Sequence, residues 1–186
     1  MINKKIHRTA FNERLSKLMV VDKQTFARIG GSLRKAGMVS VGGRGPNAPH
    51  ITPEDAKNIL LGVMGTDNAS RAAEAAKNFS ELKSASGEKL GDAITQIFKG
   101  TRKYSGLACI SVYRNFPKAI ICWTVEKENR EANEVSHENV IEEIFEAEGS
   151  GPEPAFLIEA TLKGNPLTTE INLLDWLEKI EDQVIK

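Results

Sequence analysis

The spacing of apolar residues changes near residue 101 of this 186-residue chain. Before that point, apolar side chains recur at intervals of about three or four positions, which is typical of amphipathic helices. After it, residues 107–113 and 119–125 form two short apolar runs separated by a turn that contains Pro, which predicts an antiparallel strand pair. With a third strand expected at 155–162, the sequence predicts an α+β fold with a small three-stranded antiparallel sheet and helices.

Residues 1–100 are predicted to be helical. Asp22 is a typical N-cap, Gly37 suits a left-handed helix end, and Thr52-Pro53-Glu54-Asp55 is a strong helix start. The helices expected in this part are 8–19, 23–36, 53–64, 68–83 and about 90–100. Two more are expected beyond it, at 138–148, where Val140, Ile141, Ile144 and Phe145 have helical spacing, and at 171–184.

Charge is distributed unevenly along the chain, although the formal net charge is zero. Residues 1–50 contain ten Lys or Arg against two acidic residues, a net charge of +8, whereas 51–105 carry +1 and 106–186 carry −9. A basic segment suits a polyanion, because each cation that neutralises a phosphate releases condensed counterions. We therefore expect a DNA-binding domain at 1–100 and an acidic domain at 101–186 for partner binding or oligomerisation. A charge asymmetry that serves only solubility, or attraction between the halves, is the simpler alternative.

The first two predicted helices and the residues after them indicate a winged helix-turn-helix module. Residues 38–41 are expected to form a short strand, and the run 42–50, rich in Gly and Pro, a projecting loop or wing. Gln24 and Arg28 lie one helical turn apart and suit adenine and guanine edges, while Arg44 would lie at the wing tip. The predicted DNA-binding residues are Lys23, Gln24, Thr25, Arg28, Ser32, Arg34, Lys35, Arg44, Asn47 and His50.

An ordinary helical hairpin with a solvated basic face is the alternative interpretation, since such faces are common on amphipathic helices. The occurrence of charge, hairpin and projecting Gly-Arg-Gly loop within one short segment favours contact with DNA.

Part of this segment resembles known sequences. Residues 22–61 contain Leu33-Arg34-Lys35-Ala36-Gly37-Met38 and the loop Gly42-Gly43-Arg44-Gly45-Pro46-Asn47-Ala48-Pro49-His50-Ile51-Thr52-Pro53. They resemble the N-terminal part of uncharacterised phage and prophage proteins from alphaproteobacteria. The Leu-Arg-x-Ala-Gly-hydrophobic ending is also similar to that of winged helix-turn-helix regulators in general. The resemblance covers roughly residues 10–65 and implies a phage-encoded regulator or a DNA-packaging component.

No catalytic or cofactor-binding motif is recognisable. The glycine-rich loop lacks the Gly-Lys-Ser/Thr ending of a P-loop, and no Ser or Cys nucleophile motif is present. His7, His50 and His137 are far apart in sequence and lack neighbouring ligands, so we expect no metal site. The glutamates of 126–148 could supply the carboxylates of a metal-dependent nuclease, but a solvated helix face explains them better. We predict a protein that is not an enzyme and needs no cofactor.

The compartment expected from the sequence is the cytoplasm. No apolar run is long enough to span a membrane, and no apolar segment follows the basic residues near the N-terminus as in a secretory signal. Cys109 and Cys122 lie in strand-like runs and are interpreted as buried thiols. A disulfide between neighbouring strands is geometrically possible but less expected in the cytoplasm.

Taken together, these features predict a sequence-specific protein that binds double-stranded DNA as a homodimer, a transcriptional regulator of phage or bacterial origin. One alternative is a small terminase subunit or other phage DNA-packaging or assembly protein. A second is an inhibitor that binds a host protein through its acidic half and does not touch DNA. A dimer is expected because one helix in one groove makes too few contacts for strong specificity.

Overall fold

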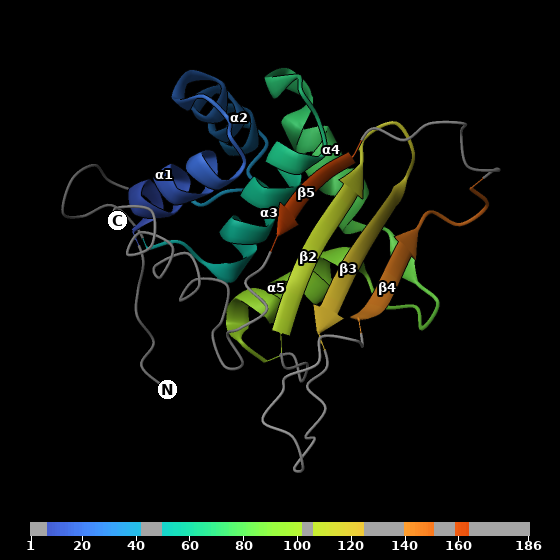
Figure 1. Cartoon of the computed structure of the whole chain (residues 1–186). Coiled ribbons are helices and arrows are strands. Elements are labelled where there is room, and N and C mark those ends of the chain that lie inside the picture. The colour runs from blue at the N-terminus through green and yellow to red at the C-terminus, as the bar shows by residue number, and fades with distance from the viewer. Residues whose placement is uncertain (1–6, 42–49, 102–105, 125–139, 151–158, 164–186) are drawn as a thin grey trace, which may run out of the picture.

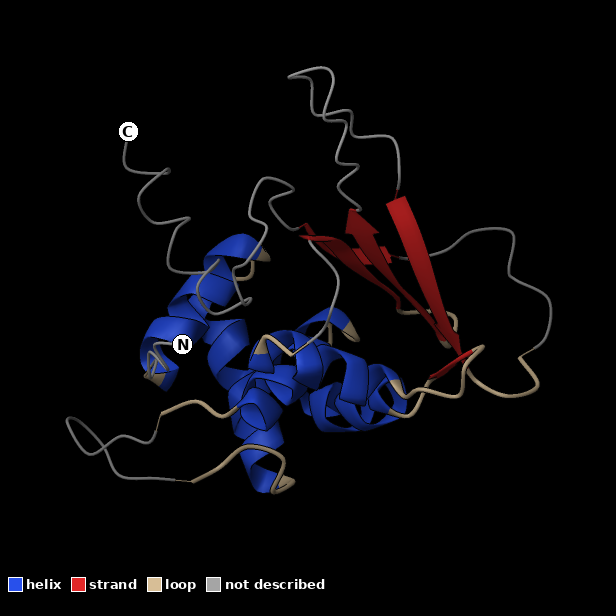
Figure 2. Ribbon diagram, turned by 90° about the horizontal axis from the view of Figure 1, so that it is seen from below, coloured by secondary structure: helices blue, strands red, loops and turns tan. Residues whose placement is uncertain are grey.

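The computed structural model describes residues 7–41, 50–101, 106–124, 140–150 and 159–163. These residues form a layer of helices against one face of an antiparallel sheet, and Figure 2 shows the helices together on one side of the strands. The α+β class expected from the sequence is confirmed. Among the described residues, no helix is both long and apolar enough to span a bilayer.

Most of the helices and strands are labelled in Figure 1, and they are numbered in the order in which they occur in the chain. The helices are α1 (Arg8–Leu18), α2 (Lys23–Lys35), α3 (Pro53–Met64), the short 3-10 helix η2 (Ala69–Arg71), α4 (Ala72–Ser80) and α5 (Leu90–Lys99). The strands are β1 (Lys83–Ser84), β2 (Gly106–Tyr113), β3 (Lys118–Thr124), β4 (Val140–Glu146) and β5 (Glu159–Lys163), in the spatial order β1-β4-β3-β2-β5.

Local capping chemistry sets the helix ends, as the sequence predicts. The Asp22 carboxylate accepts from the amides of Gln24 and Thr25 at the start of α2. Thr52 and Asp55 form a reciprocal capping box at the start of α3. Gly37 has φ +70°, and the amide that follows it donates to the Leu33 carbonyl, which ends α2 in a Schellman arrangement. The helix predicted at 68–83 is shorter, beginning as η2 and ending with α4 at Ser80.

The sheet buries one face against the helices. Ile110, Val112, Ala119 and Ile121 alternate with more exposed residues along β2 and β3, and all four are fully buried. The strands predicted at 107–113 and 119–125 are thus confirmed. The second half of the strand predicted at 155–162 is found in β5, which pairs with the edge of β2 that β3 leaves open, whereas residues 155–158 lie outside the described residues.

The helix predicted at 138–148 is wrong, because the chain forms β4 there. β4 pairs with β3 along its whole length, from Thr124 opposite Val140 to Lys118 opposite Glu146. Of the apolar residues that suggested a helix, Phe145 is fully buried, while Ile144, its neighbour on the other sheet face, is 43% exposed. Satisfying the backbone groups on the free edge of β3 outweighs the local helical spacing. The sheet is therefore larger than the three strands expected.

The wing strand predicted at 38–41 is also wrong. The Ser40 amide donates to Oδ1 of Asp55 over 2.8 Å, and the Ser40 hydroxyl donates to Oδ2 over 2.6 Å. The Asn58 side-chain amide donates to the Met38 carbonyl over 2.6 Å. Because polar groups of α3 take up these bonds, the segment runs along α3 and has no strand partner among the described residues. His50 instead makes an isolated antiparallel bridge with His7.

One hydrophobic core joins the helices and the sheet. It runs from Phe11 and Leu15 of α1 through α3, whose residues 55–64 are all buried, to Phe145 of β4. This core crosses residue 101, and the division of the chain into domains at 1–100 and 101–186 stays a prediction. The connection predicted at 126–133 and the helix predicted at 171–184 lie outside the described residues.

Arg114, in the turn between β2 and β3, fastens the sheet to the C-terminal end of α3. Its Nε donates to the carbonyl of Met64 over 2.7 Å, and its guanidinium also forms an ion pair with Asp67. A cation at this position satisfies carbonyls that have no partner within the helix and complements the negative end of the helix dipole.

Asp55 joins α1, α3 and the segment after α2. Besides its bonds with Ser40, its carboxylate accepts from the Thr52 amide and lies 3.6 Å from the Arg8 guanidinium. Burial by itself raises the pKa of Asp55, but the hydrogen bonds from Ser40 and Thr52 outweigh it and hold the pKa below the usual 3.8. The folded state therefore favours the charged carboxylate.

We predict that Asp55→Asn lowers the free energy of unfolding at pH 7 by about 2 kcal/mol, since hydrogen bonds to a charged acceptor are lost. Because the pKa of Asp55 is lowered by folding, the wild-type protein keeps this contribution above pH 3.8 and loses it as the pH falls further. Urea unfolding from pH 7 to pH 3 should show the two proteins converging. Asp92→Asn, at an exposed carboxylate, is the control, and equal losses in both variants would contradict the role of Asp55.

The turn between α1 and α2 holds a strained residue. Val20 has φ +52°, a left-handed conformation that β-branched side chains rarely adopt, and is 91% exposed. Asn tolerates this conformation, so Val20→Asn should raise the free energy of unfolding by about 1 kcal/mol. Val41→Asn is a matched control, because Val41 is 81% exposed without a positive φ. Thermal unfolding that shows no gain specific to position 20 would refute the prediction.

Candidate nucleic-acid interface

The exposed face of α2 is the candidate functional surface. Phe26, Ile29 and Leu33 are buried and hold the opposite side of α2 against the core. With 3.6 residues per turn, Gln24, Arg28 and Lys35 point roughly away from that buried side. All three are exposed. The structure thus brings together on one helix face the two residues for which we predict contacts with base edges.

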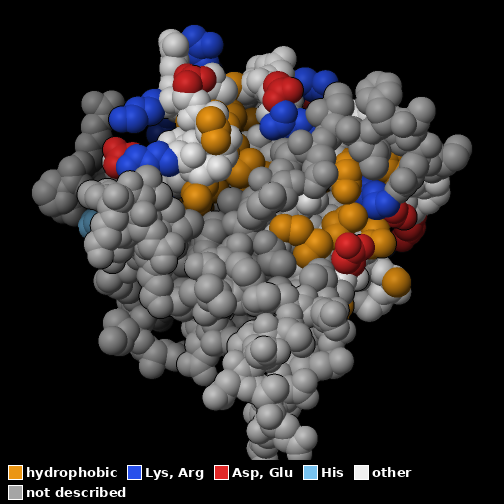
Figure 3. Space-filling view, in the orientation of Figure 1, with side chains coloured by type: hydrophobic (Ala, Val, Ile, Leu, Met, Phe, Trp, Pro, Cys, Tyr) orange, Lys and Arg blue, Asp and Glu red, His pale blue; other side chains and the backbone are white. Residues whose placement is uncertain are grey.

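The cations of α2 are available to a partner. Lys23, Arg28, Arg34 and Lys35 are all exposed, and no ion pair joins them to another described residue. The helix itself contains no acidic residue. Figure 3 shows Lys and Arg side chains where Figure 1 places α1, α2 and α4, with a few Asp and Glu among them. Arg28 and Lys35 lie on the face that carries Gln24, while Lys23 and Arg34 flank it.

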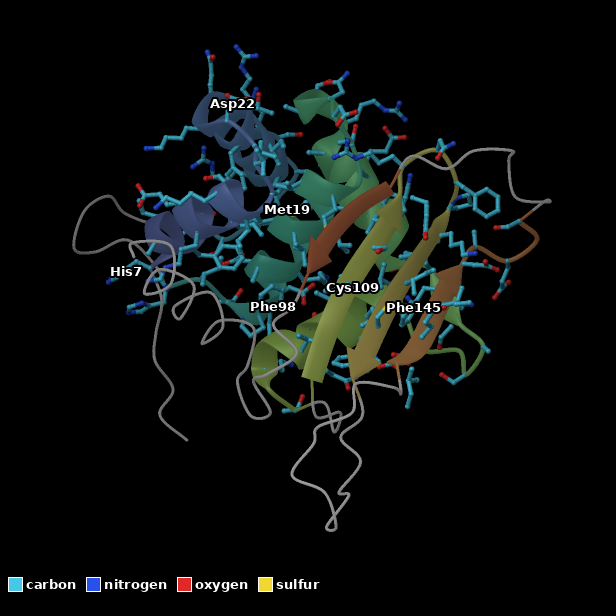
Figure 4. The ribbon with its side chains drawn as sticks, viewed as in Figure 1. His7, Met19, Asp22, Phe98, Cys109 and Phe145 are labelled. Carbon is cyan, nitrogen blue, oxygen red and sulfur yellow. The ribbon has the colours of Figure 1, made fainter. Side chains whose placement is uncertain are left out.

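The N-terminus of α2 is capped by the carboxylate of Asp22. Hydrogen bonds from Thr25, through its hydroxyl and its amide, lower the pKa of Asp22 against a small opposing effect of burial, and the nearby Arg28 adds to the lowering. The Thr25 amide donates to the Asp22 carboxylate over 2.9 Å and so takes part in capping the helix. Because the charged Asp22 occupies the positive end of the helix, an anionic partner must contact the side of α2. Figure 4 shows Asp22 at the tip of the molecule.

Other predicted residues lie away from this face. The Ser32 hydroxyl donates to the carbonyl of Ser70 over 3.3 Å, which joins α2 to η2. His50 lies against His7 at the start of α1, with ring centroids 4.6 Å apart, in the region where Figure 4 labels His7. Arg44 and Asn47 lie outside the described residues.

Gly30 and Gly31 are a feature that residue-type reasoning missed. Both lie inside α2, where glycine costs up to about 1 kcal/mol relative to alanine. A Cβ built on either would meet no atom within 4 Å, so packing does not require them. Gly31 follows Arg28 by three positions and Ala27 by four, which places it on the exposed face. Two adjacent glycines within a helical pattern are the sequence signal that could have revealed this part of α2, where no side chain projects and the space above the helix is open.

A hollow elsewhere on the molecule is a weaker candidate for a binding site. It has a volume of about 450 Å³ and lies between the residues after α3, one side of α4 and the β2–β3 turn. Two arginines line it, but Arg114 is paired with Asp67, and Arg71 with Glu74. The hollow therefore offers an anionic ligand no unpaired arginine from the part of the chain that the structure describes. Nor do these residues contain a group of three or more side chains suited to a metal ion.

Searches against protein-family models, curated proteins and solved structures find no match for this chain. The resemblance to phage proteins and to winged helix-turn-helix regulators therefore stays a prediction, and α2 is the feature that bears on function.

We predict that Gly30→Ala and Gly31→Ala each raise the free energy of unfolding, by up to about 1 kcal/mol, because alanine favours the helix and meets open space. Gly91→Ala is the contrasting control, since its Cβ would collide with the side chain of Ser80. Urea unfolding should show gains at 30 and 31 and a loss at 91. A lower free energy of unfolding in all three variants would mean that the space around Gly30 and Gly31 is not open.

Proposed function

We propose that this protein binds double-stranded DNA by placing the exposed face of α2 in the major groove, and that it acts as a cytoplasmic transcriptional regulator of phage or bacterial origin. The observation that carries the proposal is the joint presence of Gln24, Arg28 and Lys35 on a face without acidic residues. Gln and Arg are the side chains that form paired hydrogen bonds with adenine and guanine, respectively.

The shape of α2 supports entry into a groove. An α-helix with its side chains is about 10–12 Å across, close to the roughly 12 Å width of the major groove. Ala27 and Gly31 keep the middle of the face flat, so the helix backbone can come close to the base edges while Gln24 and Arg28 extend on one side. This use explains why a helix keeps a glycine that weakens it.

Phosphate contacts would come from the flanking cations. Lys23, Arg34 and Lys35 would supply charge around the face that carries Gln24 and Arg28, and α1 packs against α2. In our proposal Arg44, Asn47 and His50 add contacts from the segment between α2 and α3. A homodimer would double the contacts of one helix, with the acidic half of the chain available for subunit or partner binding.

The proposal predicts different effects for different substitutions on α2. Gln24→Ala and Arg28→Ala should each reduce discrimination at particular base pairs by about 1–3 kcal/mol. Lys35→Ala should weaken binding to all sequences and reduce the slope of log affinity against log salt by about one unit. A DNA selection with the full chain would give the preferred sequence, and fluorescence anisotropy at several salt concentrations would give the affinities.

Two controls separate DNA contact from general effects of charge and stability. Lys99→Ala removes an exposed cation at the end of α5 and should leave affinity and salt slope unchanged. Gly31→Ala should lower affinity although it stabilises α2, a combination that a purely structural glycine would not show. If Lys99→Ala and Lys35→Ala weaken binding equally, α2 is not the interface.

Two alternative functions can each be distinguished from the proposed one by a simple experiment. A small terminase subunit would bind DNA as a ring, so a ring-shaped oligomer in native mass spectrometry would favour packaging over regulation. An inhibitor of a host protein would not retain mixed-sequence duplex even at low salt, where a non-specific DNA binder still does.

A further inference from the structure

The sheet places the two cysteines of the chain directly opposite one another. Cys109 of β2 and Cys122 of β3 are register partners in an antiparallel pair. Opposite residues in such a pair project to the same face, with Cα atoms about 4.5–5.5 Å apart. A disulfide needs a Cα separation of about 4.4–6.8 Å, so the backbone already has the spacing for one.

An irregularity in the register creates this alignment. Leu107 pairs with Trp123, and a regular ladder would therefore place Ala108 opposite Cys122. The register shifts between Leu107 and Cys109, so that Cys109 takes that position. Bulges of this kind change which side chain is presented at a given point of a sheet. The cysteine pair thus depends on a specific distortion of β2.

The cysteine pair is neither in the core nor fully exposed. The neighbouring residues Ile110 and Ile121 are fully buried in the core, so alternation along the strands turns both cysteines to the face away from the helices. Both cysteines are partly exposed, and both are thiols in the structure. Figure 4 labels Cys109 on β2. Both are thiols, as expected, but neither is fully buried.

We propose that Cys109 and Cys122 form a redox-active dithiol that a peroxide oxidises to an intrachain disulfide. One thiolate attacks a peroxide oxygen, which breaks the O–O bond and leaves a sulfenic acid and hydroxide. The second thiolate attacks the sulfenic sulfur, forming the S–S bond and releasing the second hydroxide. The two thiol protons complete two water molecules, and the peroxide gains the two electrons that the sulfurs lose.

The disulfide would bond β2 to β3 covalently in the middle of the sheet. It would close the chain through the Arg114–Pro117 turn and restrict the unfolded ensemble. Because both cysteines are partly exposed, thiol reductants could reach the bond, as in labile rather than purely structural disulfides.

The test uses the full, reduced wild-type chain treated with one equivalent of hydrogen peroxide. We expect loss of both thiols to maleimide labelling and a fall in intact mass equal to two hydrogen atoms. Peptide mapping should show the crosslink between the two cysteines, and dithiothreitol should restore both thiols. Retention of both thiols, or a gain of oxygen without a crosslink, would overturn the proposal.

Two comparisons test whether the fold causes the reaction. Cys109→Ser and Cys122→Ser should each keep a thiol that gives only a sulfenic acid or a disulfide between chains. The wild-type chain unfolded in urea should form the intrachain disulfide more than about tenfold more slowly, because the strands no longer hold the sulfurs together. Equal rates in the folded and unfolded chain would show that the register plays no part.

Discussion

The buried carboxylate of Asp55 determines how α2 is presented. It caps α3, holds the segment after α2 through Ser40, and lies beside Arg8 of α1, so three parts of the chain meet at one charged group. A charge with this little contact with water is stable only while its partners remain in place. The orientation of α1 and α2 against α3 therefore depends on hydrogen bonds as well as on the apolar core.

Local chemistry made the helical part predictable. Asp22, Thr52 and Gly37 act at short range, so their effects on helix ends are visible in the sequence. β4 and the segment 38–41 depend on partners distant in the chain. The apolar residues of β4 fit a helix as well as a strand, and only the free edge of β3 decides between them. Ser40 likewise gives no sign of its bond with Asp55 fifteen positions away.

The same distinction between local and long-range effects applies to the candidate interface. The faces of α2 follow from helical periodicity, so the exposure of Gln24, Arg28 and Lys35 could be foreseen. The bond from Ser32 to Ser70 and the pairing of His50 with His7 could not, because they depend on how α2, η2 and the start of α1 meet. The open space around Gly30 and Gly31 is likewise a property of the assembled surface.

The order of strands in the sheet has a consequence for synthesis on the ribosome. β2 pairs with β3 across a short turn, but its other edge receives β5, which is made about 50 residues later. While the nascent chain lacks residues 159–163, that edge of β2 exposes unpaired amides and carbonyls, which can template pairing with a second chain. Delayed arrival of one short strand thus makes the growing polypeptide vulnerable to intermolecular association.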